Sequence, residues 1–142
     1  VPIPLVKSPF NEVHARFSPD GRWLAYTSDE SGRNEIYVRS LNGSPQKWQV
    51  SYAGGTWPNW RPDGRELVFL SAGNQLMALP VLPGRSFSTG DIDALFRVDP
   101  AGSGSVFDVA DNGRRFLVNT NISRAESMPV TVVVGWQANL TR

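Results

Sequence analysis

The order of apolar and polar residues repeats three times along the chain. Each copy passes through a polar turn that ends in glycine and continues with consecutive apolar residues. Aligned on the turn glycines Gly21, Gly64 and Gly113, the copies lie 43 and 49 residues apart. The copies occupy residues 15–26, 59–69 and 108–118. A repeat of about 40–50 residues that contains several short strands is typical of the blades of a β-propeller.

The turn of each copy predicts a hairpin. Ser18-Pro19-Asp20-Gly21 fits a type I turn, because proline fixes φ at the second position and glycine then accepts a left-handed backbone. Arg61-Pro62-Asp63-Gly64 repeats this pattern, whereas Ala110-Asp111-Asn112-Gly113 lacks the proline but keeps residues that tolerate the same backbone. We therefore expect three similar hairpin turns.

The strand after each turn is predicted to be the most buried strand of its unit. Strict alternation of apolar and polar residues indicates one wet face, whereas consecutive apolar residues indicate that both faces are covered. The consecutive apolar residues occupy 23–26, 67–70 and 116–118. This is the pattern expected where each blade packs between two neighbours.

The remaining strands complete an all-β prediction. The sequence indicates third strands at 35–39 and 75–79, outer strands at 47–50 and 94–97, a final strand at 130–134, and a leading outer strand within residues 3–6. No segment has a helical apolar period that is free of proline and glycine. The fold class expected is a partial β-propeller of about three four-stranded antiparallel blades plus the leading strand.

The predicted domain organisation is a single partial propeller that spans residues 1–142. Its parts are an outer strand of a preceding blade at 1–8 and blades at 12–51, 55–98 and 104–137. Propellers close with four to eight blades, so three blades form an arc with open apolar faces at both ends. Two explanations stay open: the chain is the C-terminal piece of a longer protein, which its non-methionine start favours, or two arcs pair to close a ring.

Composition excludes several classes of function. The formal net charge is +1 and the basic residues are scattered, so we expect no binding to nucleic acid. The chain has no cysteine, which excludes disulfides, thiolate metal sites and cysteine nucleophiles. No apolar stretch approaches the length of about 18 residues that a membrane-spanning helix requires, so membrane insertion of this segment is not expected.

The repeats resemble the WD40-like repeat often called the PD40 repeat. An aromatic residue, a Pro-Asp-Gly turn, an apolar strand and an Ile-Tyr-Val-type strand follow one another, most closely in residues 17–38 and 60–79. This repeat builds the propellers of the TolB translocation protein, the tricorn protease and prolyl oligopeptidase relatives. The resemblance implies a propeller fold and a role in binding.

A second resemblance covers nearly the whole chain. Segments such as 47–51, 75–78, 115–119 and 132–140 are similar to the C-terminal propeller of large bacterial proteins, many of them acidobacterial serine/threonine kinases with an extracytoplasmic propeller. It implies a sensor or interaction module in the periplasm or at the cell surface. Kinase activity is not implied, because no glycine-rich loop, His-Arg-Asp or Asp-Phe-Gly motif is present.

Four residues form the candidate binding site: His14, Arg16, Trp57 and Asn59 precede or begin the innermost strands of the first two repeats. In a propeller these positions lie near the central channel. An aromatic ring beside amide and guanidinium groups is suited to hold a peptide or a sugar. The alternative is that Trp57 only fills the interface between two blades.

No residue is assigned to catalysis, to a cofactor or to a metal. His14 is the only histidine, and the serines at 103 and 105 lack the spacing of a nucleophile elbow. Asp29, Glu30, Asn34 and Glu35 gather oxygen ligands, but their spacing does not match a calcium-binding loop. The aspartates of the repeated turns are explained by the turns themselves.

The function expected is a non-catalytic propeller module that binds a protein or a small ligand. Its further partners are the remaining blades, either in the same chain or from a second copy. Two alternatives remain: an accessory propeller of a peptidase or other hydrolase, and a half-propeller that closes by homo-oligomerisation.

Overall fold

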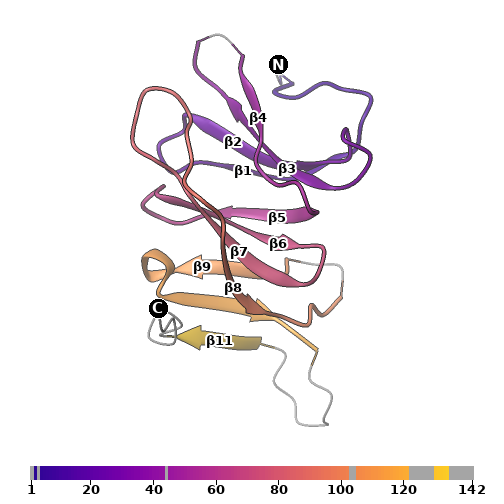
Figure 1. The fold of residues 1–142 in the computed structure, drawn as a ribbon, viewed down its shortest axis with the longest axis vertical. Coiled ribbons are helices and arrows are strands. Elements are labelled where there is room, and N and C mark those ends of the chain that lie inside the picture. Colours follow the sequence, from indigo (N-terminus) through magenta and orange to yellow (C-terminus); the bar gives the residue numbers. More distant parts are fainter. Residues whose placement is uncertain (1, 3, 44, 103–104, 122–129, 135–142) are drawn as a thin grey trace.

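The computed structural model describes the chain except for residues 1, 3, 44, 103–104, 122–129 and 135–142. Three antiparallel sheets follow one another along the long axis of the molecule (Figure 1). The first sheet contains β1 (Glu12–Phe17), β2 (Trp23–Ser28), β3 (Glu35–Ser40) and β4 (Lys47–Gln49). The second contains β5 (Gly55–Trp60), β6 (Glu66–Ser71), β7 (Gln75–Pro80) and β8 (Asp93–Arg97). The third contains β9 (Phe107–Ala110), β10 (Arg115–Asn119) and β11 (Val130–Val134).

Each strand pairs with the next strand along the chain, so that every sheet is a meander. Strands β1 and β2 of the first sheet contact β5 of the second, and β5 contacts β9 of the third. The innermost strands of the three sheets are therefore neighbours, as in adjacent propeller blades. The described residues contain no helix beyond the single 3₁₀ turn η1 (Asp111–Gly113). The all-β, partial β-propeller prediction is confirmed.

Two of the three repeated turns have the predicted geometry. The amide of Gly21 donates to the Ser18 carbonyl at 2.9 Å, and the amide of Gly64 donates to the Arg61 carbonyl at 2.8 Å. Both glycines have a left-handed backbone, with φ of 70° and 72°. This is the conformation that the sequence pattern requires of glycine.

The third turn differs from the expected one. It closes one residue later, where the amide of Arg114 donates to the Asp111 carbonyl at 3.1 Å. Asp111, Asn112 and Gly113 all have positive φ. Without a proline to fix φ, an Asp-Asn-Gly sequence accepts consecutive left-handed residues, which proline forbids. The expectation of one shared backbone for all three turns is therefore wrong for this turn.

Two apolar cores lie between the sheets and explain the consecutive apolar residues of β6. Leu67 and Phe69 belong to the core shared with the first sheet, which also contains Trp23 and Trp60. Val68 and Leu70 belong to the core shared with the third sheet. Side chains alternate between the two faces of a strand, so a strand that lies between two sheets needs apolar residues at every position.

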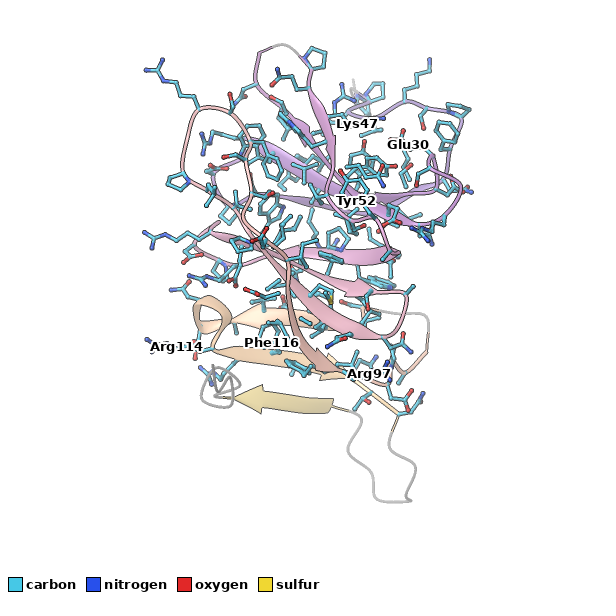
Figure 2. The ribbon with its side chains drawn as sticks, in the orientation of Figure 1. Glu30, Lys47, Tyr52, Arg97, Arg114 and Phe116 are labelled. Atoms are coloured by element: carbon cyan, nitrogen blue, oxygen red, sulfur yellow. The ribbon has the colours of Figure 1, made fainter. Side chains whose placement is uncertain are left out.

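Burial in β10 corrects the prediction for the third unit. Phe116 and Val118 are buried, whereas Leu117 is 46% exposed. The Phe116 ring (Figure 2) meets Phe96 of β8 edge to face, with ring centroids 5.5 Å apart. Leu117 faces away from the second sheet, and no described sheet covers that side. The third apolar segment is thus buried on one face only.

The chain before β1 also differs from the prediction. Residues 2 and 4–8 form no strand. Val6 instead packs on the outer face of the first sheet, against a cluster that contains Leu24, Tyr26 and Tyr37. A strand needs a neighbour with which to pair, and no described sheet precedes the first one. The leading outer strand expected at 1–8 is therefore absent from these residues.

The sheets fall inside the ranges expected for the blades, 12–51, 55–98 and 104–137. The first two sheets have four strands, as predicted, and the described part of the third has three. A fourth strand after Val134 would lie outside the described residues.

Candidate functional site

Two aromatic residues of the candidate site occupy equivalent β-bulges. The pairing of β1 with β2 shifts between Val13 and Arg16, and the pairing of β5 with β6 shifts between Thr56 and Asn59. His14 and Trp57 lie inside these shifts, each with a φ of 56°. A positive φ is rare for a bulky residue, and a bulge re-aims the side chain that it carries. The bulge therefore repeats from the first sheet to the second with an aromatic ring at the same position.

The bulges bring the two rings together. The centroids of the His14 and Trp57 rings are 3.5 Å apart, with an interplanar angle of 23°. The Oγ1 atom of Thr56 lies 3.3 Å from Nδ1 of His14. Burial and the neighbouring Arg16 cation both lower the pKa of His14, so the ring is neutral at pH 7. A neutral imidazole stacked on an indole joins the first two sheets.

Trp57 also packs against the second core. It contacts the cluster that contains Val106 and Phe107, while part of its ring stays exposed. Trp57 thus fills an interface between sheets, which was one of the two interpretations of this residue. Trp57 is nevertheless only partly buried, so its accessible atoms can still contact a bound molecule.

A polar row crosses the three inner strands at a second equivalent position. Arg16, Asn59 and Asp108 each precede the glycine of their own turn by the same number of residues. The Nδ2 atom of Asn59 donates to Oδ1 of Asp108 at 2.9 Å. Arg16 and Asp108 are exposed, and Asn59 is half-buried. A cation, an amide and a carboxylate therefore follow one another across the three sheets.

The structure connects the four candidate residues only in part. His14 stacks on Trp57, and Asn59 bonds to Asp108. The Arg16 guanidinium bonds to the backbone carbonyl of its neighbour Ala15 at 3.0 Å, and the Arg16 carbonyl accepts from the indole of Trp60. Sequence reasoning missed Asp108, although its place in the third repeat matches that of Arg16 and Asn59.

The acidic residues of the first hairpin loop do not share a site. Asp29 accepts two hydrogen bonds from Asn11, and Glu30 pairs with Lys47 at 2.6 Å (both ends of this pair are labelled in Figure 2). Glu35 is buried and accepts hydrogen bonds from Arg33, Ser51 and the amide of Gly54. Each carboxylate has its own partner, and the described residues contain no cluster of three or more metal-ligating side chains.

Comparison with known sequences finds two partial relatives. No family model matches the chain. A stretch of 56 residues is 36% identical to an uncharacterized protein of Agrobacterium fabrum, over 39% of this chain and 19% of that protein. A stretch of 54 residues is 39% identical to the Tol-Pal system protein TolB of Alcanivorax borkumensis, over 37% of this chain and 12% of TolB. The matched stretches thus cover less than a fifth of either relative.

Comparison with solved structures identifies the fold. The crystal structure of TolB from Acinetobacter baumannii matches with a TM-score of 0.55 and 20% identity, over 77% of this chain and 26% of that one. A candidate 6-phosphogluconolactonase from Bacteroides uniformis matches with a TM-score of 0.55 and 17% identity, over 81% of this chain and 34% of that one. At these identities the likeness concerns the fold alone.

None of the described residues lies in a helix that is long and apolar enough to cross a bilayer. In sequence and in fold, the chain is similar to the blades of TolB-type β-propellers.

Proposed function

We propose that this chain is a non-catalytic binding module, whose inner strands contact a segment of a partner protein. The observation that carries the proposal is the alignment of Arg16, Asn59 and Asp108 across three sheets, beside the stacked pair of His14 and Trp57. Strands of a packed sheet hold such groups more precisely than loops do. The similarity to TolB-type propellers supports a role in protein interaction rather than in catalysis.

The chemistry of these groups favours a peptide. A guanidinium donates to carbonyl or carboxylate oxygens. The Asn59 amide offers its carbonyl oxygen as an acceptor and its second N–H as a donor to a main chain, and the Asp108 carboxylate offers acceptors. The exposed part of Trp57 provides a surface for a flat side chain. Among the described residues His14 stacks on Trp57 and lies near Thr56, and it contacts no carboxylate of the kind that orients a catalytic histidine.

A display library of random linear peptides is the probe that tests this function. We expect selected peptides to bind the chain and to lose about tenfold or more in affinity with Arg16→Gln or Asn59→Ala, since each substitution removes hydrogen bonds to the ligand. The control is Arg85→Gln, in an exposed loop outside the inner strands. Selected peptides that bind all three variants equally well would refute the proposed site. Mass spectrometry of the incubated peptides tests the absence of catalysis, which cleavage would contradict.

The sensor role is a finer proposal within this function. It rests on the resemblance to propellers of bacterial kinase-type proteins, and it places the module outside the cytoplasm. The gene sequence upstream of the codon for Val1 distinguishes the sensor role from the alternative role as an accessory propeller of an enzyme. A kinase domain followed by a membrane span supports sensing, whereas a hydrolase domain supports gating of an enzyme.

We further propose that the open faces of the arc receive other blades, in the same chain or from a second copy. Phe17 and Leu117 lie on opposite ends of the arc and are 60% and 46% exposed. Apolar side chains of this size are commonly covered by a neighbouring sheet. Light scattering on the purified chain distinguishes the two sources: a dimer supports pairing of two arcs, and a monomer of 15.6 kDa excludes it.

A further inference from the structure

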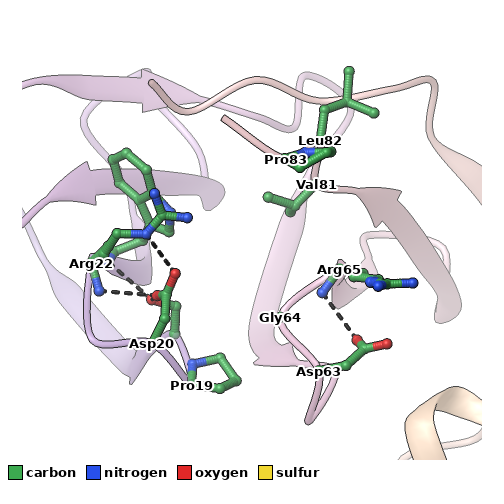
Figure 3. Close-up of a pocket in the computed structure, with 11 residues that line it drawn as sticks. Pro19, Asp20, Arg22, Asp63, Gly64, Arg65, Val81, Leu82 and Pro83 are labelled. Atoms are coloured by element: carbon green, nitrogen blue, oxygen red, sulfur yellow. Dashed lines mark hydrogen bonds and ion pairs between the residues drawn. The ribbon is translucent and has the colours of Figure 1, made fainter. Parts of the chain in front are cut away.

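A groove of about 750 Å³ lies between the first two repeated turns and the loop that follows β7. Figure 3 shows the first turn on the left, the second turn on the right, and Val81, Leu82 and Pro83 above them. This volume is in the range of sites that bind small molecules or short peptide segments. The groove is separate from the inner-strand residues of the proposed function.

The apolar side of the groove is built by an unusually long connection. Residues 81–92 join β7 to β8, whereas only residues 41–46 join the equivalent strands β3 and β4. The long loop folds back over the first sheet, where Phe87 is buried against Trp23 with ring centroids 5.4 Å apart. This anchor holds the loop across the junction of the two sheets and leaves Leu82 46% exposed at the groove.

The first turn contributes ionic groups that are already paired. The Nε atom of Arg22 donates to Asp20 at 2.6 Å, and its Nη1 atom donates to the Gly84 carbonyl at 2.9 Å. Burial acts to raise the pKa of Asp20, but hydrogen bonds from Ser18 and Arg22 outweigh it and lower this pKa. The Asp20 carboxylate is therefore ionised and fully engaged within its own turn.

The second turn leaves the equivalent arginine free. Arg65 follows Gly64 as Arg22 follows Gly21, yet Asp63 is held by two nitrogens of Arg61, at 2.8 and 2.6 Å. Arg61 stands at the position of Ser18, and its hydrogen bonds lower the pKa of Asp63. The exposed Arg65 guanidinium has no hydrogen bond or ion pair among the described residues. One residue difference between the repeats thus leaves an unpaired cation beside the groove.

We propose that this groove binds an extended peptide of a partner protein, in which a proline or aliphatic side chain precedes a carboxylate. The apolar side chain packs between Pro19 and the exposed Leu82 and Pro83. The carboxylate pairs with Arg65, the one cation lining the groove that has no ion pair among the described residues. The site is a peptide groove at the junction of two blades, separate from the inner strands.

Short synthetic peptides test this binding. Acetyl-Gly-Pro-Leu-Glu-Gly-amide carries an internal carboxylate, and acetyl-Gly-Pro-Leu with a free C-terminus carries a terminal one. Their controls replace Glu by Gln and amidate the terminus. Titrations followed by ¹H–¹⁵N NMR measure the dissociation constant and the shift of the Arg65 Nε–H resonance. We expect weak binding of at least one acidic peptide and about tenfold weaker binding of its neutral control, because the charged hydrogen bond is lost.

Two variants of the protein locate the site. Arg65→Gln removes the cation and is expected to raise the dissociation constant about tenfold. Arg61→Ser keeps Arg65 but releases Asp63, which then competes for Arg65 as Asp20 does for Arg22, so the same loss is expected. The matched control is Arg114→Gln, because Arg114 follows Gly113 in the third turn and is exposed.

The outcomes are decisive in both directions. Binding that requires the carboxylate and Arg65 supports the groove, and the preferred peptide identifies an internal or a terminal carboxylate. The proposal is overturned if neither acidic peptide binds, if the neutral peptides bind as well, or if Arg65→Gln and Arg114→Gln behave alike. Arg16→Gln, which tests the inner strands, is expected to leave this binding unchanged. Failure of one proposal is thereby separate from failure of the other.

Discussion

Phe17 and Trp60 occupy the same position of the first and second repeats, yet their surroundings are opposite. Trp60 is 5% exposed, lies in the core between the first two sheets, and donates its indole N–H to the Arg16 carbonyl at 3.0 Å. Phe17 is 60% exposed, because no described sheet precedes the first one. The repeat therefore places a large aromatic residue at the same position of the first two inner strands. Whether that residue is buried depends on whether a preceding sheet packs against it.

The largest effect predicted from this comparison is at Trp60. Trp60→Ala should lower the free energy of unfolding by about 3–5 kcal/mol, since it leaves a cavity between two sheets and orphans a carbonyl. Phe17→Ala should cost less than about 1 kcal/mol, because most of the ring is already in water. Urea unfolding of both variants measures the difference. Equal losses would show that Phe17 is covered in solution.

A smaller effect separates two neighbouring residues of β10. Val118 is 2% exposed and Leu117 is 46% exposed. Val118→Ala removes fewer carbons than Leu117→Ala, yet it should cost more, about 1–3 kcal/mol against about 0.5 kcal/mol or less. Thermal unfolding of the two variants under one condition tests the order. A larger cost for Leu117→Ala would indicate a partner on the outer face of the third sheet.

The buried hydroxyl of Thr27 in β2 provides a further test. This hydroxyl has no hydrogen-bond partner among the described residues. Thr27→Val keeps the shape and removes this unpaired group, so it should stabilise the chain by about 1 kcal/mol. Thr27→Ser keeps the hydroxyl and loses a methyl group, so it should destabilise. Chemical unfolding that shows a loss of stability for Thr27→Val would mean that the hydroxyl has a partner.

The smallest effect predicted is the pH dependence contributed by His14. Its pKa is lowered in the folded state by burial and by Arg16. The unfolded chain therefore binds a proton more readily, and the stability associated with the neutral ring declines as pH falls below about 6.5. Unfolding at pH 7 and pH 5.5 measures this loss. His14→Phe keeps an aromatic ring without a titrating group, so its stability should change less over that range; an equal change would assign the pH dependence to other groups.

Local sequence patterns predicted the strands and two of the turns, because these depend on neighbouring residues. The Pro-Asp-Gly turns at Gly21 and Gly64 fix φ through proline and glycine wherever they occur. The third turn escaped prediction, since without proline several backbones suit Asp111, Asn112 and Gly113. Repeat alignment also carried enough information to add Asp108 to the candidate site, through its equivalence to Asn59.

Contacts between distant segments were beyond prediction. Nothing in the sequence near residues 81–92 indicates that the loop crosses to the first sheet, where Phe87 meets Trp23 and Arg22 meets Gly84. The pairing of Arg61 with Asp63, which leaves Arg65 without an ion pair among the described residues, needs an arginine at position 61 and also a side-chain geometry that only the structure shows. The groove lies between the two turns and the loop that these contacts hold, so its lining also depends on the tertiary structure.

The repeat, the all-β character and the apolar strands can all be read from local sequence, because turn chemistry and alternation act over a few residues. The burial of each apolar face depends on the tertiary structure, since it requires a distant segment or a neighbouring sheet to pack against that face. Phe116 and Leu117 stand side by side in one apolar run, and only the position of the second sheet leaves the first residue buried and the second exposed.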